Sequence, residues 1–198
     1  MKISGRKKGL CAFCRTPTTY EQEEEYKRLK NLMEKGNGEA FCTLGGCYAI
    51  GELGLPQDMK KASELWLKAG ELGCSDGYTN LSSAFIQGTG VERDSDMKKA
   101  KYYYELAAMG GNISARFNVG CLEEEAGNDR RAFKHFILAA KAGHKKALNE
   151  VTSGFMNGYI KKDEYANILR AHHERQKEMK SDARDKAAAS GIFSLVTA

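Results

Sequence analysis

The chain has very little proline and no long apolar segment. Only 2 of its 198 residues are proline, and Ala, Glu, Lys and Leu are frequent, which favours helices over a β-sandwich or a disordered linker. No apolar run approaches the roughly 20 residues that a membrane span needs, so no membrane-spanning helix is expected. The formal charge of +5 is spread along the sequence. This weak basic excess does not indicate nucleic-acid binding.

The N-terminus lacks the features of a secretory signal. The basic cluster within residues 2–8 is followed by Gly9-Leu10-Cys11 and not by the apolar segment that such a signal requires. We therefore expect a cytoplasmic protein. In that compartment the six cysteines should be mostly reduced, so no disulfide framework is expected.

An internal repeat explains why the chain has 21 glycines. The pattern Ala-x6-Ala-x3-Gly occurs at Ala62–Gly73, Ala100–Gly111 and Ala132–Gly143. Four residues after each of these glycines, and after Gly36, the chain has a small residue: Ala40, Gly77, Ala115 and Ala147. Self-similarity at this spacing is the signature of a repeat architecture.

Each repeat unit predicts two helices separated by glycine turns. Four residues after each small residue come Leu44, Leu81, Val119 and Val151, and four further on come Tyr48, Phe85, Glu123 and Phe155. Steps of four mark one face of a helix. A single helix pair cannot bury both of its faces, so the units should stack. The sequence therefore predicts an all-α fold, an α-solenoid of stacked antiparallel helix pairs with about four repeats and helical caps.

The boundaries follow from this register. We expect a basic arm with an incomplete zinc knuckle at 1–18, a capping helix at 19–36, repeats at 37–160, and a C-terminal capping helix and tail at 161–198. Tyr165, Ile168 and Leu169 have the spacing needed to cover the last repeat. The third unit departs from the pattern, because Glu123 replaces the aromatic residue and the loop after it is short.

One stretch carries a family resemblance. From Ala40 to Gly73 the chain reads Ala-x3-Leu-Gly-x2-Tyr-x2-Gly and then Asp-x3-Ala-x6-Ala-x3-Gly. This resembles the Sel-1-like repeat, and the resemblance covers roughly residues 20 to 170. It implies a relative of tetratricopeptide solenoids that acts as an adaptor in signalling or in membrane-associated protein degradation.

Ahead of the repeats, Cys11-Ala12-Phe13-Cys14 resembles the last ligand pair of a RING-type zinc finger, with Ala12 in place of the usual proline. Structural zinc needs four ligands, so two thiolates cannot complete a site. Cys11 and Cys14 are expected to bind zinc only if further ligands come from elsewhere, and no cofactor is expected. A redox pair is the less favoured alternative.

Other suggestive motifs have simple structural interpretations. His172 and His173 face different sides of a helix and are interpreted as surface residues, while Tyr102–Tyr104 is interpreted as packing. No nucleophile with a base is found. We therefore predict a non-catalytic scaffold or adaptor. The alternative is the substrate-selecting part of a RING-type ubiquitin ligase, and a hydrolase is a distant third.

A binding surface is predicted on the first helix of each unit, opposite the core face. Its residues are small and mostly uncharged, unlike the lysine-rich second helices, which suits close approach by another chain. Thr43, Asn80, Asn118 and Glu150 would form a ladder in a concave groove. Asn80 and Asn118 either hold an extended peptide backbone or only bridge neighbouring helices. The full predicted set is Thr43, Thr79, Asn80, Ser83, Phe117, Asn118, Cys121, Asn149, Glu150 and Ser153.

The expected partner is a protein or an extended peptide, with no nucleic acid and no membrane span. The chain itself is expected to be a monomer.

Overall fold

The computed structural model describes residues 20–89 and 97–189, with side chains described as far as residue 182. All regular structure in these ranges is helical, as the repeat predicts. The described residues form two compact units that divide after Asn112. None of the described helices is long and apolar enough to cross a membrane. The predicted basic arm and zinc knuckle, at 1–18, lie outside the described residues.

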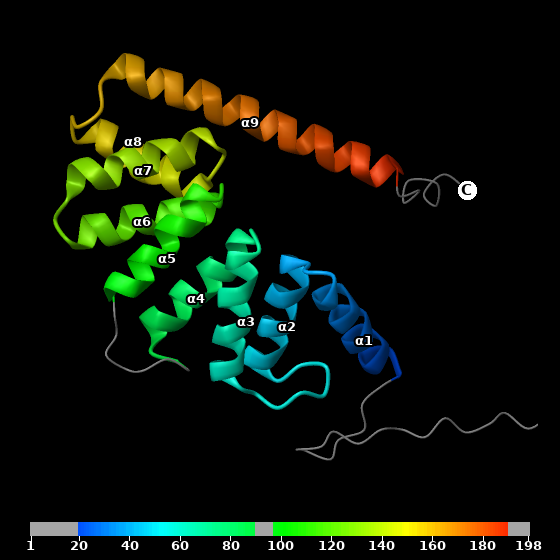
Figure 1. Cartoon of the computed structure of the whole chain (residues 1–198). Helices are drawn as coiled ribbons and strands as arrows, with labels where there is room; N and C mark the ends of the chain where they lie inside the picture. Colours follow the sequence, from blue (N-terminus) through cyan, green and yellow to red (C-terminus); the bar gives the residue numbers. More distant parts are fainter. Residues whose placement is uncertain (1–19, 90–96, 190–198) are drawn as a thin grey trace, which may run out of the picture. The chain divides into compact units, whose positions relative to one another are not determined.

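The first unit contains five helices. They are α1 (Tyr20–Glu34), α2 (Gly38–Ile50), α3 (Met59–Glu71), α4 (Ser75–Gln87) and α5 (Met97–Met109). In Figure 1 the blue to green ribbon follows them, with α2 beside α3 and α4 beside α5. Helix α3 also packs on α4. The unit therefore consists of two stacked pairs preceded by the single helix α1.

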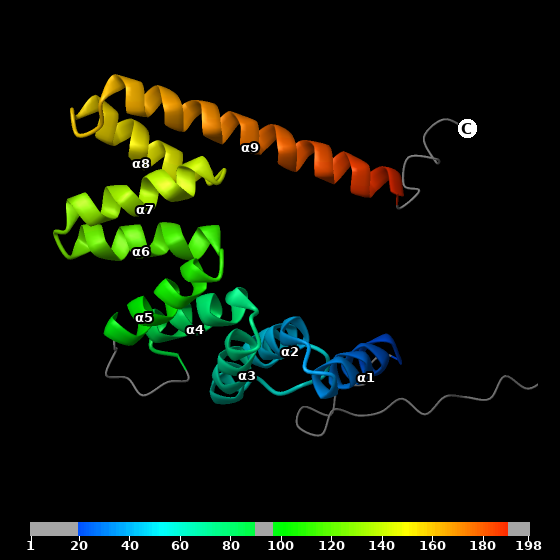
Figure 2. The same ribbon diagram turned by 45° about the horizontal axis from the view of Figure 1, so that its top comes forward.

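The second unit contains four helices. They are α6 (Ile113–Glu125), α7 (Asp129–Lys141), α8 (Lys145–Met156) and α9 (Lys162–Ala189). Helices α6 and α7 form one pair, and α7 also packs on α8. Figure 2 shows α6, α7 and α8 in succession, with the C-terminal part of α9 extending beyond them.

Polar caps define where the helices begin. The Asn37 side chain accepts a hydrogen bond from the Ala40 amide at 3.0 Å, and Asp58 accepts from the Lys61 amide at 2.9 Å. These bonds satisfy amides that have no partner within the first turn. Helix α2 ends at Gly51, whose φ of 78° is the left-handed conformation that glycine adopts at least cost.

The core of the first unit is built around Trp66 on α3. Its indole nitrogen donates to the Cys42 carbonyl on α2 at 3.3 Å. Two glycines allow this approach. A Cβ at Gly45 would lie 2.6 Å from the Trp66 ring, and one at Gly77 would lie 2.5 Å from the Trp66 carbonyl oxygen. The predicted core residues Leu44 and Tyr48 are buried in the same cluster.

The core of the second unit is built around Phe136 on α7, which is fully buried. A Cβ at Gly120 would lie 2.5 Å from its ring. Val151 on α8 and Ile168 on α9 are buried in the same cluster. Small residues thus let the helices pack closely in both units.

The C-terminal cap differs in part from the prediction. Ile168 is fully buried, and the Tyr165 ring stacks on Phe155 with centroids 4.4 Å apart. Leu169, in contrast, is 39% exposed, so its predicted covering role is wrong. One residue after Ile168, it is rotated by about 100° away from the buried face. His172 takes part in the packing instead, since its Nδ1 lies 2.7 Å from the Ala140 carbonyl oxygen.

Candidate protein-binding site

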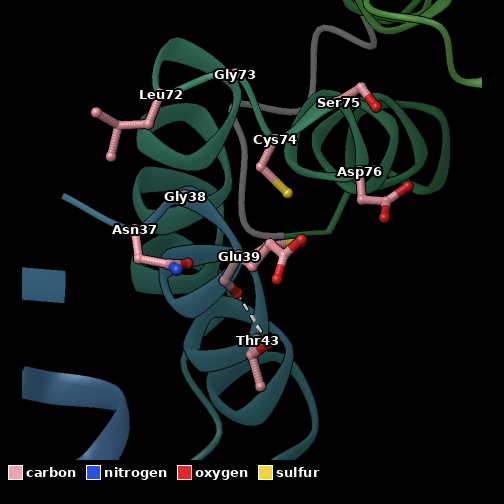
Figure 3. Close-up of a pocket in the computed structure, with 10 residues that line it drawn as sticks. Asn37, Gly38, Glu39, Thr43, Leu72, Gly73, Cys74, Ser75 and Asp76 are labelled. Atoms are coloured by element: carbon pink, nitrogen blue, oxygen red, sulfur yellow. Dashed lines mark hydrogen bonds between the residues drawn. The ribbon is translucent and has the colours of Figure 1, made fainter. Parts of the chain in front are cut away.

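A hollow of the first unit lies where the N-terminal ends of α2 and α4 meet. It has a volume of about 660 Å³ and is lined by residues 37–39, Cys42 and Thr43 on one side and by residues 72–76 on the other. We call it the α2–α4 pocket. Figure 3 shows the Cys74 side chain directed into the space between the two helices. The pocket therefore joins the first helices of two successive pairs.

The α2–α4 pocket is polar and carries negative charge. Glu39 and Asp76 supply carboxylates, and its lining includes no lysine or arginine. Burial raises the pKa of Cys42 to about 12, with further contributions from Cys74 and Asp76. Cys42 is thus a neutral thiol at neutral pH. This charge pattern is unsuited to a phosphate backbone, which needs positive side chains.

Predicted residues of α2 and α4 lie in or beside this pocket. Thr43 is exposed, and its hydroxyl donates to the Glu39 carbonyl at 2.9 Å, as the dashed line in Figure 3 marks. The half-buried Asn80 side chain donates to the Cys42 sulfur at 3.5 Å. Asn80 therefore bridges neighbouring first helices, which was one of the two roles expected for it. Its side-chain oxygen has no hydrogen-bond partner among the described residues.

A second hollow continues along the same two helices. It has a volume of about 320 Å³, and its lining includes Ala49, Asn80, Ser83 and Gln87 above the Trp66 ring. The Ser83 hydroxyl lies 3.0 Å from the Tyr104 hydroxyl on α5 and donates to the Thr79 carbonyl at 3.1 Å. Ser83 is thus held by the partner helix of its pair instead of pointing freely away from it.

In the second unit the predicted residues lie on α6 and α8. Asn149 and Ser153 are exposed, while Asn118, Cys121 and Glu150 are half-buried. The Asn118 amide has no hydrogen-bond partner within the part of the chain that the structure describes. These side chains are therefore in position to meet another molecule.

Phe117 differs from the expectation that it points away from the partner helix. Its ring lies 5.6 Å from that of Phe136 on α7 and stacks on His144 at 4.7 Å. A long side chain on a helix leans over the preceding turn, so a large ring reaches the core from a position where a short side chain would not. Phe117 is a packing residue in this structure.

The face of the second unit is also acidic. The pKa of Glu124 is raised by burial and by the nearby carboxylates of Glu150, Asp129 and Glu125. Burial raises the pKa of Cys121 as well, followed by the effect of Glu124. Each unit therefore has carboxylates beside its predicted binding residues.

Sequence reasoning missed part of the α2–α4 pocket. Cys74 and Asp76 were not among the predicted residues, yet both line it. A signal was available in the register. Cys74 directly precedes α4, at the position held by Asn37 and His144 in other units, and those two residues cap helices. A cysteine is not a capping residue and so stands out there.

No metal site is evident among the described residues, since they contain no group of three or more His, Cys, Asp or Glu side chains that could hold an ion. Cys11 and Cys14 lie outside the described ranges, so the zinc-knuckle hypothesis stays a prediction.

Solved structures with the same fold are known. A Sel1 repeat protein from Oxalobacter formigenes superposes with a TM-score of 0.64 at 22% identity, covering 77% of this chain and 64% of that one. The protective antigen c5321 of uropathogenic Escherichia coli superposes with a TM-score of 0.61 at 24% identity, covering 75% and 33%. These likenesses establish the solenoid fold.

Curated relatives include three proteins of different roles. The chain is 27% identical over 146 residues to chitin synthase regulatory factor 4 of Schizosaccharomyces pombe, and 31% identical over 115 residues to the ERAD-associated E3 ubiquitin-protein ligase component HRD3B of Arabidopsis thaliana. It is 32% identical over 108 residues to cytochrome c oxidase assembly factor 7 of Mus musculus. The matches cover 73%, 58% and 50% of this chain but only 22%, 18% and 46% of those proteins.

The repeat itself identifies the family. Sel1 repeats match residues 43–74, 75–112 and 114–144, which correspond to the three helix pairs α2–α3, α4–α5 and α6–α7. Proteins built of these repeats are scaffolds for protein interaction. With more than half of its length matched, this chain belongs to the Sel1 repeat family.

Proposed function

We propose that this chain is a non-catalytic scaffold that binds an extended segment of another protein along its first helices. The observation that carries the proposal is that residues of α2 and α4 line two hollows, a mainly polar one of about 660 Å³ and a mainly apolar one of about 320 Å³. Hollows of this size can accept side chains of a bound segment.

The chemistry of this surface suits a peptide backbone. Thr43 and Asn80 offer hydroxyl and amide groups, and amides both donate and accept hydrogen bonds. The Asn80 oxygen is available to accept from a backbone N–H group while its nitrogen stays on Cys42. Contacts of this kind hold an extended chain without demanding one particular sequence.

The carboxylates favour a protein partner over a nucleic acid. Glu39 and Asp76 line the α2–α4 pocket, and Glu124 and Glu150 lie together on the second unit. They repel phosphate groups and attract lysine and arginine, so we favour a protein segment over a nucleic acid. We propose that the scaffold acts in the cytoplasm as a monomer.

The experiment is a selection of peptides from a random display library on the purified full chain, followed by affinity measurement by fluorescence anisotropy. The double variant Asn80→Ala, Asn118→Ala should lower affinity about tenfold, the equivalent of one or two lost hydrogen bonds. The control Lys60→Ala, on the exposed face of α3, should leave affinity unchanged. Unchanged binding by a double variant that retains its helical circular dichroism would refute the groove proposal.

A second candidate is the substrate-selecting part of a RING-type ubiquitin ligase. It is favoured by the similarity to a protein named as an E3 ligase component and by the Cys11-x2-Cys14 pair. A complete finger would recruit the conjugating enzyme while the solenoid selects the substrate. Additional in-frame Cys-x2-Cys pairs in the gene upstream of Met1 would support this candidate, and an upstream sequence without them would contradict it.

A further inference from the structure

Two cysteines from successive repeats line the α2–α4 pocket. Cys42 lies on α2, Cys74 directly precedes α4, and both are half-buried free cysteines. Cys74 is near enough to help raise the pKa of the Cys42 thiol. One turn before Cys42 the helix has Gly38, and a Cβ there would lie 3.1 Å from the Cys74 Cβ. The missing side chain at Gly38 thus lets Cys74 sit directly against α2.

Cys74 also occupies the position that holds a helix-capping residue in other repeats. Asn37 and His144 hold the equivalent position in the register, and each accepts a hydrogen bond from a helix amide. The Cys74 side chain makes no such cap bond. Its side chain points into the pocket that Cys42 also lines, and the Asn80 amide donates to the Cys42 sulfur at 3.5 Å.

We propose that Cys42 and Cys74 form a reversible disulfide that ties α2 to the start of α4 across the pocket. Both cysteines line the pocket and are partly exposed, which gives a small oxidant access to them. A disulfide requires two cysteine side chains that are close enough to be joined without moving the backbone. The shared pocket and the close approach of Cys74 to α2 at Gly38 supply that proximity. This site goes beyond the proposed scaffold function and does not depend on a partner.

A hydroperoxide can drive the reaction. The Cys74 sulfur attacks one oxygen of hydrogen peroxide, so that a sulfur–oxygen bond forms, the oxygen–oxygen bond breaks and water leaves. Cys74 is thereby oxidised to a sulfenic acid. The Cys42 sulfur then attacks the Cys74 sulfur, the sulfur–oxygen bond breaks, and the departing hydroxide takes the Cys42 proton as a second water. Two thiols and one peroxide give one disulfide and two waters.

The surroundings favour this order of events. Burial raises the pKa of Cys42, and Cys74 and Asp76 add to the effect, so Cys42 remains protonated and is a poor first nucleophile. It is well placed as the resolving thiol, because both cysteines line the same pocket. A dithiol reductant reverses the reaction by thiol exchange and is itself oxidised to a disulfide.

The experiment treats the reduced full-length chain with stoichiometric hydrogen peroxide, alkylates the remaining thiols and maps the tryptic peptides by mass spectrometry. We expect a linked peptide pair joining Cys42 to Cys74 that has lost two hydrogen atoms and that dithiothreitol separates. Cys47, which lies in the same tryptic peptide as Cys42, should be alkylated. If Cys42 and Cys74 are both alkylated while other cysteines oxidise, or if they link only between chains, the proposal is wrong.

Stability gives a second measurement. Cross-linking restricts the unfolded chain, so oxidation should raise the Tm of the wild-type protein by roughly 5–10 °C. Cys42→Ser and Cys74→Ser should each abolish the rise, while Cys47→Ala should retain it. A rise that persists without either Cys42 or Cys74 would overturn the assignment.

Discussion

Helix pairs α2–α3 and α6–α7 place different residues at the same position of the repeat. In the first unit this position holds Tyr48, which is buried with the Lys61 ammonium 4.2 Å from its ring centroid. In the second unit it holds Glu123, which is only 3% exposed. The Asn128 amide donates to one Glu123 oxygen at 2.9 Å, and the Arg131 guanidinium lies 3.8 Å from the other.

The difference explains the two loops. The Tyr48 ring fills its place by packing, with the Lys61 ammonium against it, and the connection that follows is the longer one at residues 51–58. A buried carboxylate needs polar partners, and the short connection at residues 126–128 brings Asn128 and Arg131 back over it. The shortened loop is therefore part of how the second unit accommodates a charge in place of a ring.

The largest expected effect tests the close packing that both units share. Gly77→Ala would set a Cβ 2.5 Å from the Trp66 backbone oxygen, whereas Gly120→Ala would meet the Phe136 ring, a side chain that can shift. We expect Gly77→Ala to lower the free energy of unfolding by about 2–3 kcal/mol and Gly120→Ala by about 1–2 kcal/mol. Urea denaturation measures both.

Gly46→Ala is the matched control, because no heavy atom lies within 4 Å of its added Cβ. Removing a helical glycine there should stabilise the protein by about 0.5–1 kcal/mol. If the three alanine variants have equal stability, the close approach at Gly77 and Gly120 does not control the packing.

The next prediction concerns the buried carboxylate. Asn128→Ala removes the amide that donates to Glu123 and should lower the free energy of unfolding by about 1–2 kcal/mol, the cost of a weakened buried polar group. Asn157→Ala, at the exposed end of α8, should cost under about 0.5 kcal/mol. If Asn128→Ala lowers the free energy of unfolding no more than Asn157→Ala does, the loop does not support Glu123.

The two units should also respond differently to acid. His144 Nδ1 accepts from the Ala147 amide at 3.2 Å at the start of α8, and burial, followed by Lys146, lowers its pKa below 6.5. The cap is therefore complete above pH 6.5 and is lost as the pH falls through the lowered pKa. Because the ring is half-exposed, the loss should stay under about 1 kcal/mol.

Hydrogen exchange of α2 and α8 amides at pH 7 and pH 5, corrected for intrinsic rates, measures this difference. Protection of α8 should fall in acid, while α2, capped by Asn37, should show no such fall. His144→Asn keeps an acceptor that does not titrate in this range and should remove the acid sensitivity. Equal sensitivity of the variant and the wild type would contradict the assigned cap.

The smallest effect is expected at the missing cap of α4. Cys74→Asn should add a side-chain acceptor at a position where Cys74 makes no cap bond and raise the free energy of unfolding by about 0.5–1 kcal/mol. The reciprocal variant Asn37→Cys should lower it by a similar amount. Thermal denaturation under reducing conditions measures both, and changes of the same sign would refute the capping argument.

Much of the fold can be predicted from the sequence because small residues and glycines recur at fixed spacing. Ala40, Leu44 and Tyr48 are buried as their spacing predicts, and Asp58 caps α3. The residues of the candidate site were harder to predict from the sequence. Counting 100° per residue places Phe117 on the outer face, but its long side chain reaches Phe136. The meeting of Cys42 and Cys74 depends on how two pairs stack, which periodicity within one helix does not encode.

The most direct test of the central claim is NMR of the ¹⁵N-labelled full chain titrated with a peptide from the display selection. Binding along the first helices should shift backbone amides of α2 and α4 and the side-chain amide of Asn80, and leave the exposed face of α3 around Lys60 unchanged. Shifts confined to α3, α5 or α9, with α2 and α4 unaffected, would contradict the account.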